Sequence, residues 1–174
     1  MEGTIALFDA IIEEHKQIME DVETSEHIAD DLGAILEMDR ATGEFEPATL
    51  DRKRRGLQGL QQSLGKVDKE LQAHFAREER ALLTAFEDYG GKTFASALRA
   101  LLVEHQELKN RIAKSKQDAA ELAEGGLSRG VWEGRAYGMR VYISHTRKLL
   151  EAHAQSELEL LQALRKELVE HRRE

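Results

Sequence analysis

The chain has 174 residues, a formal net charge of −8, 33% charged residues and 41% hydrophobic residues. It contains no cysteine, which excludes disulfides, thiolate-ligated zinc or iron–sulfur sites and cysteine catalysis. The excess of acidic residues, 33 Asp and Glu against 25 Lys and Arg, disfavours a general binder of nucleic acid or anionic membranes. No apolar run is long enough to span a membrane, and the N-terminus lacks the pattern of a signal peptide. We therefore expect a soluble, cytoplasmic protein with a single domain over residues 1–174.

Apolar residues recur at helical spacing along nearly the whole chain, which predicts four long helices. The turns between them contain the only proline, Pro47, and two pairs of glycines. Three short connections between four long helices predict an all-α, antiparallel up-down-up-down four-helix bundle. The expected helices span about residues 4–36, 49–89, 93–124 and 128–171.

Glycines interrupt the helical pattern at several points. Gly130, Gly134 and Gly138 follow one another at intervals of four residues near the beginning of the fourth helix. This strip without side chains predicts a close contact with a neighbouring helix. Because the helices are longer than a small core requires, we also expect bends near Gly33, Gly65 or Gly138.

Four of the seven histidines lie at matching depths in the predicted bundle. They fall within about 10 Å of one another along the bundle axis. Each also lies in the apolar stripe of its own helix, so we expect the side chains to point into the core. A single histidine in such a stripe is usually a hydrogen-bonded core residue, and the prediction of a metal site depends on the joint pattern. The four residues, one from each helix, are His15, His74, His105 and His153.

Two of these helices add a carboxylate four residues after the histidine. His74 is followed by Glu78, and His153 by Glu157, and residues at i and i+4 share one face of a helix. Four imidazoles and two carboxylates exceed a tetrahedral zinc site and suit two metal ions, each bound by two histidines and both bridged by the carboxylates. Mixed nitrogen and oxygen ligands favour iron or manganese. Ferritin-like proteins use Glu-x-x-His instead, and no histidine here has glutamate three residues before it.

Residues near the predicted ligands are candidates for the pocket or for hydrogen bonds to the ligands. Glu79 and Glu104 adjoin ligands in the sequence and are candidates to accept from histidine N–H groups, with exposed surface as the alternative. His145 lies eight residues before His153, too far to bind the same metal from a regular helix, and is a candidate to line the pocket or donate a proton. Tyr142 is a candidate to line the pocket, with core packing as the alternative.

The combination of these motifs resembles the hemerythrin-like family of HHE cation-binding domains. The resemblance implies a non-haem di-iron centre with two bridging carboxylates, reactive toward O₂, peroxide or nitric oxide. Oxygen-carrying members have a further histidine four residues after the third-helix ligand, where this chain has Lys109, so the resemblance is to the branches with two histidines per iron. The motifs span nearly the whole chain and comprise Glu-Glu-His at His15, His-x-x-x-Glu at His74, Glu-His at His105 and His-x-x-x-Glu at His153.

From this resemblance we expect two iron ions, oxo- or hydroxo-bridged, with manganese and zinc as alternative metals. The expected function is binding of, or reaction with, O₂, peroxide or nitric oxide, in sensing, storage or detoxification. Two alternatives stay open: a helical interaction or scaffold bundle with a structural or vestigial metal site, and a catalase-like di-iron enzyme. The expected partner is the small ligand, without nucleic acid or membrane, and a homodimer is compatible with the sequence.

Overall fold

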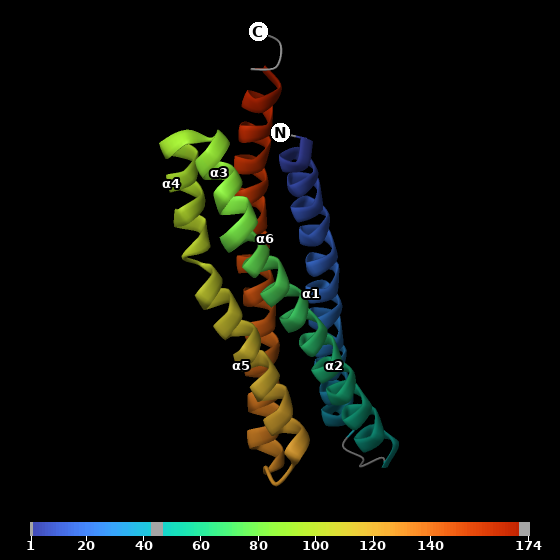
Figure 1. Cartoon of the computed structure of the whole chain (residues 1–174). Helices are drawn as coiled ribbons and strands as arrows, with labels where there is room; N and C mark the ends of the chain where they lie inside the picture. Colours follow the sequence, from blue (N-terminus) through green and yellow to red (C-terminus); the bar gives the residue numbers. More distant parts are fainter. Residues whose placement is uncertain (1, 43–46, 171–174) are drawn as a thin grey trace.

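The computed structural model describes residues 2–42 and 47–170, and the described side chains are those of residues 2–37 and 51–170. The turn expected near Pro47 and the expected end at His171 therefore lie partly outside the described residues. Nearly all of what is described is helical (Figure 1). The elements are α1 (Glu2–Thr42), α2 (Pro47–Arg77), the π-helical segment η1 (Glu78–Leu82), α3 (Leu83–Tyr89), α4 (Gly91–Leu102), α5 (His105–Glu124) and α6 (Arg129–Glu170).

These elements form the four arms of an antiparallel up-down-up-down bundle (Figure 1). The first and last arms are the continuous helices α1 and α6. The second arm combines α2, η1 and α3, and the third combines α4 and α5. Both α1 and α5 contact α2 and α6, so the four arms surround a common core. The predicted all-α four-helix bundle is confirmed, and no helix among the described residues is long and apolar enough to cross a membrane.

The core consists of three apolar clusters stacked along the bundle, and each cluster draws side chains from all four arms. One cluster lies at the end of the bundle where α1 begins and α6 ends, and it includes Phe8 and Leu161. The next lies in the middle of the bundle and includes Ile18 and Leu150. Burial of each such side chain contributes about 1.5–3 kcal/mol. Between these two clusters every arm contributes polar residues to the interior, beginning with His15 on α1.

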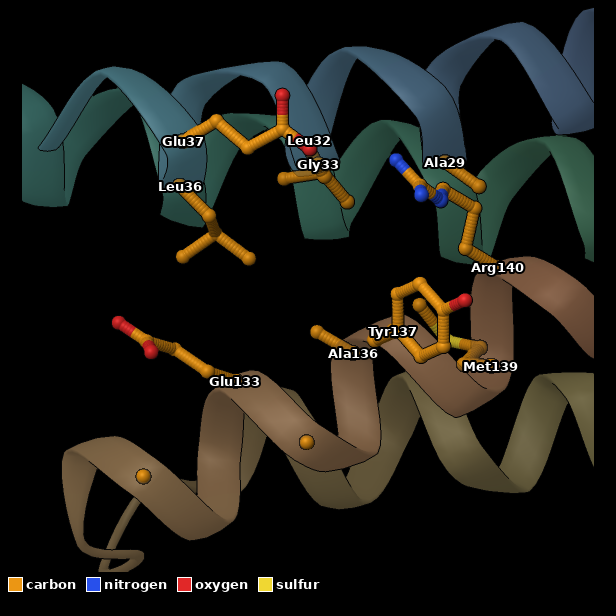
Figure 2. Close-up of a pocket in the computed structure, with 12 residues that line it drawn as sticks. Ala29, Leu32, Gly33, Leu36, Glu37, Glu133, Ala136, Tyr137, Met139 and Arg140 are labelled. Atoms are coloured by element: carbon orange, nitrogen blue, oxygen red, sulfur yellow. The ribbon is translucent and has the colours of Figure 1, made fainter. Parts of the chain in front are cut away.

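The strip of glycines in α6 does not have the role that the sequence predicted. It makes no close helix contact, because a Cβ atom at Gly134 would meet nothing within 4 Å. Gly130 and Gly134 instead line an open crevice of about 290 Å³ between α1 and α6 (Figure 2). Helices α1, α2 and α6 stay helical through Gly33, Gly65 and Gly138, since a glycine costs a helix only about 1 kcal/mol and packing supplies more.

The two irregular points of the bundle both fall at predicted metal ligands. Segment η1 begins at Glu78, and the third arm breaks at Val103 and Glu104, immediately before His105 (Figure 1). In this break the Glu104 amide donates to the Leu101 carbonyl at 3.0 Å, a tighter turn than that of an α-helix. π-Helical turns inside α-helices occur frequently at functional sites. The bundle therefore departs from regular helix at the level where its polar side chains meet.

Candidate metal centre

The six side chains that the sequence predicts as metal ligands converge at one level of the bundle. All four arms contribute, so the cluster depends on the assembled bundle rather than on any single helix. Five of the six residues are at most 3% exposed, and the His15 side chain is 12% exposed. The residues are His15 of α1, His74 of α2, Glu78 of η1, His105 of α5, and His153 and Glu157 of α6.

Glu78 lies at the centre of this cluster. Its Oε1 atom is 3.3 Å from Nε2 of His15 and also contacts Nε2 of His74. Its Oε2 atom is 3.0 Å from Nε2 of His105. The two oxygens therefore face histidines on opposite sides of the cluster, which is the arrangement required of a carboxylate that bridges two metal ions.

Glu157 occupies the other carboxylate position. Its Oε2 atom is 3.2 Å from Nε2 of His15 and 3.8 Å from Nε2 of His153. The acid thus approaches a histidine of its own helix and one of α1. Both carboxylates predicted by the His-x-x-x-Glu motifs consequently point to the same interior space as the imidazoles.

The ligand atoms form two groups, and the atoms within each group lie within 4.8 Å of one another. The rings of His15 and His74 lie with centroids 4.6 Å apart, and those of His105 and His153 lie 5.1 Å apart. Glu78 belongs to both groups, whereas Glu157 belongs to one. The geometry therefore supports two histidines for each ion and supports bridging for one carboxylate. The first group is His15, His74, Glu78 and Glu157, and the second is Glu78, His105 and His153.

The inward-facing atoms of this cluster have no hydrogen-bond partner within the described part of the chain. They are the Nε2 atoms of the four histidines and both carboxylate oxygens of the two glutamates, eight atoms in all. An unpaired buried polar group costs about 1–3 kcal/mol, and a charged one costs more. Nitrogen and oxygen donors of this kind suit first-row divalent transition metals. The residues present therefore fit a metal centre.

The electrostatics of the cluster point in the same direction. Burial lowers the pKa of His15, but contacts with Glu157 and Glu78 outweigh burial and raise that pKa to about 9. Burial raises the pKa of Glu78, but three neighbouring imidazoles, His105 first, hold that pKa well below its usual range. Burial, together with the nearby charge of Glu78, raises the pKa of Glu157. The raised pKa values of His15 and Glu157 reflect the negative charge of the neighbouring carboxylates, which a bound cation would neutralise.

Two of the histidines are held from outside by carboxylates that adjoin cluster residues in the sequence. Nδ1 of His105 lies 2.9 Å from Oε1 of Glu79, and Nδ1 of His153 lies 2.9 Å from Oε2 of Glu104. An Nδ1–H group that donates to a carboxylate fixes the tautomer and leaves Nε2 available for a metal. Glu79 and Glu104 are therefore placed to orient the two rings.

A third carboxylate of this kind was not identified from the sequence. Oε2 of Glu14 lies 2.8 Å from Nδ1 of His74, and Oε1 of Glu14 forms an ion pair with Arg77. A signal was present, because Glu14 directly precedes the predicted ligand His15, just as the other two carboxylates adjoin cluster residues. Sequence adjacency to a ligand would have identified all three.

His145 and Tyr142 lie outside the cluster, so the expectation that they line the metal pocket is not met. His145 is exposed, and its Nδ1 atom lies 3.1 Å from Nη2 of Arg111. The guanidinium of Arg111 lies over the Tyr142 ring, 4.1 Å from its centroid, and donates to Thr146 at 3.0 Å. Helix α6 is regular here, and eight residues displace His145 from His153 by about 12 Å along the axis and about 80° around it.

A small cavity of about 10 Å³ adjoins the cluster. That volume is about the minimum needed to hold one water molecule. The Phe75 ring in its wall also stacks on His105, with centroids 3.7 Å apart and planes inclined by 8°. Apart from its histidines the cavity wall is apolar. The lining residues are His15, Ile18, Met19, Leu71, His74, Phe75, Leu150, His153 and Ala154.

Comparison with protein-family models matches residues 6–174 to the hemerythrin HHE cation-binding domain. No curated protein and no solved structure matches the chain in the corresponding comparisons. The matched span includes all four arms and all six converging side chains. The helical bundle, its buried cluster of histidines and glutamates, and the family match agree with one another. The chain belongs to the hemerythrin family of HHE cation-binding domains.

Proposed function

We propose that this protein is a non-haem di-iron protein that binds or reacts with O₂, peroxide or nitric oxide, in sensing, storage or detoxification. The observation that carries the proposal is the set of eight buried ligand atoms without hydrogen-bond partners, drawn from four imidazoles and two carboxylates. The absence of thiolate in this donor set favours iron or manganese over softer metals. Two ligand groups that share Glu78 favour a pair of ions over a single one.

Each side chain has a defined role in this proposal. His15 and His74 would hold one ion, His105 and His153 would hold the other, and Glu78 would be a ligand of both. Glu157 completes the ligands of the first group. Bound iron supplies one-electron and O₂ chemistry, which amino-acid side chains lack.

The protein surroundings supply orientation and restrict access. Outer carboxylates hold three rings so that their Nε2 atoms face the interior. Apolar clusters on both sides of the polar level exclude bulk water from it. The adjoining cavity, of about 10 Å³, is only about the size of one water molecule and so disfavours a large ligand. These features favour a diatomic gas or peroxide over a larger organic substrate.

A titration of the iron-loaded protein with nitric oxide and azide tests this function. We expect new visible absorption bands with either ligand, and their absence in His105→Ala. The matched control is His27→Ala, which changes an exposed histidine outside the cluster. Retention of iron without a spectral response would contradict the proposal and favour a scaffold with a structural metal. Sustained O₂ release from peroxide that depends on His74 would identify a catalase-like enzyme.

A further inference from the structure

The carboxylates that contact histidine Nδ1 atoms form a regular series around the bundle. Each acid directly precedes or follows a cluster residue in the sequence of its own arm. Its carboxylate contacts a histidine ring on the neighbouring arm. The donor–acceptor separations are 2.8 to 2.9 Å. In order around the bundle, the pairs are Glu14 with His74, Glu79 with His105, and Glu104 with His153.

The series does not continue to His15. The closing step from α6 to α1 would need an acid beside His153 or Glu157, but their sequence neighbours are Ala152, Ala154, Ser156 and Leu158. Among the described residues, His74, His105 and His153 each have a hydrogen bond at Nδ1, and His15 has none. The His15 side chain is also the most exposed of the four, at 12% against 1–3%.

The environment of His15 on its cavity side offers no substitute. Its cavity neighbours on α1 and α6 include Met19, Leu150 and Ala154, whose side chains are apolar. The neighbouring acid Glu14 is already engaged with His74 and Arg77. Within the described part of the chain, His15 is therefore oriented by packing and by its Nε2 contacts.

We propose that His15 is the displaceable ligand of the centre, the one that leaves first when a chelator or a small external ligand attacks. This inference rests on the proposed function. Loss of an outer hydrogen-bond partner typically lowers metal affinity by about 10- to 100-fold, because the ring becomes less basic and less well oriented. Among the residues that the structure describes, His15 has no such partner, so its bond to a metal would be the weakest of the four. Loss of His15 would therefore free a ligand position in the first group.

Nuclear magnetic resonance of the zinc-loaded, ¹⁵N-histidine-labelled protein tests the orientation directly. An Nδ1–H proton held by a carboxylate is protected from exchange with water, and we expect three such signals. Glu14→Ala, Glu79→Ala and Glu104→Ala should each remove one. A fourth protected signal that disappears in His15→Ala would overturn the inference while metal binding, and with it the proposed function, stands. Failure of the wild-type chain to bind zinc or iron would instead overturn the proposed function.

Metal release from the iron-loaded protein tests the consequence. His15 and His74 belong to the same ligand group, and one ring is held by a carboxylate while the other is not. We expect both His15→Ala and His74→Ala to lower the affinity for the first ion, measured by competition with a chelator. The loss in His74→Ala should be at least ten times larger than the loss in His15→Ala. Equal or greater loss in His15→Ala would overturn the inference.

A second pair of variants avoids removing any ligand and so protects the test against misfolding. Glu14→Ala should speed release of the first ion by about 10- to 100-fold, because His74 then lacks its partner as well. Its matched control is Glu13→Ala, which changes an exposed neighbouring acid that pairs with Lys16 at 3.2 Å. An unchanged release rate in Glu14→Ala, or an equal change in Glu13→Ala, would contradict the role of the outer carboxylates.

Discussion

Oε2 of Glu78 lies 3.0 Å from Nε2 of His105, and these two residues mark the two irregular points of the bundle. Glu78 begins the π-helical segment of the second arm, and His105 begins α5 directly after the break in the third. Two departures from regular helix thus meet across the core at the candidate metal centre. This contact places Glu78 between the two ligand groups.

The shared position of Glu78 predicts unequal effects of removing the two carboxylates. Glu78→Gln should lose both ions, since Glu78 belongs to both ligand groups. Glu157→Gln should retain the ion of the second group, because Glu157 belongs only to the first. Elemental analysis of the two purified variants measures this difference, and equal metal content in both would contradict the bridging role.

Metal removal should destabilise the protein. A metal that binds only the native state stabilises it by about 2.7 kcal/mol at a free concentration 100 times its dissociation constant. We expect a chelator to lower the unfolding temperature of the iron-loaded protein by several degrees, measured by calorimetry. The same chelator should leave Glu78→Gln unchanged, and an equal shift in that variant would place the stabilising metal elsewhere.

Filling the small cavity should slow ligand binding. Ala154 lines the cavity, and Ala154→Leu adds volume there at a cost in stability of about 1–3 kcal/mol. We expect a lower rate of nitric oxide binding with unchanged metal content, measured by stopped-flow spectroscopy. Ala152→Leu, on the exposed face of the same helix, is the matched control and should bind at the wild-type rate. If both variants bind as fast as wild type, the ligand reaches the centre by another route.

The surface cluster around His145 should be independent of the metal centre. His145→Ala removes the contact with Arg111 and leaves every converging ligand in place. We expect metal content and visible spectrum to match wild type, with a change in unfolding free energy of no more than about 1 kcal/mol. A loss of iron in this variant would restore His145 as part of the site.

The sequence predicted the bundle and the convergence of its histidines because both follow from regular helical geometry. Apolar periodicity sets the buried face of each helix, and His15 and His153 lie in those faces. The i, i+4 rule placed Glu78 and Glu157 beside their histidines. Those inferences require only constant rise and rotation per residue, and α1 and α6 are regular throughout.

The irregular features could not be predicted in the same way. A π-helical turn changes the register by a single residue, which leaves the apolar pattern around Glu78 nearly unchanged. The break before His105 contains neither proline nor glycine to signal it. Its apolar residue Val103 is 77% exposed, so the apolar pattern does not mark the break either. Gly33 and Gly65, where weak helix propensity suggested irregularity, lie within continuous helix, because packing on neighbouring arms offsets the cost of a glycine.

The most direct test of the account is the metal content of the protein purified without added metal, together with its visible spectrum. The account predicts about two iron ions per chain and the absorption bands of a coupled ferric pair, both lost in Glu78→Gln. A chain that remains free of metal after anaerobic reconstitution with Fe(II), and that unfolds at the same temperature with and without the metal, would contradict it.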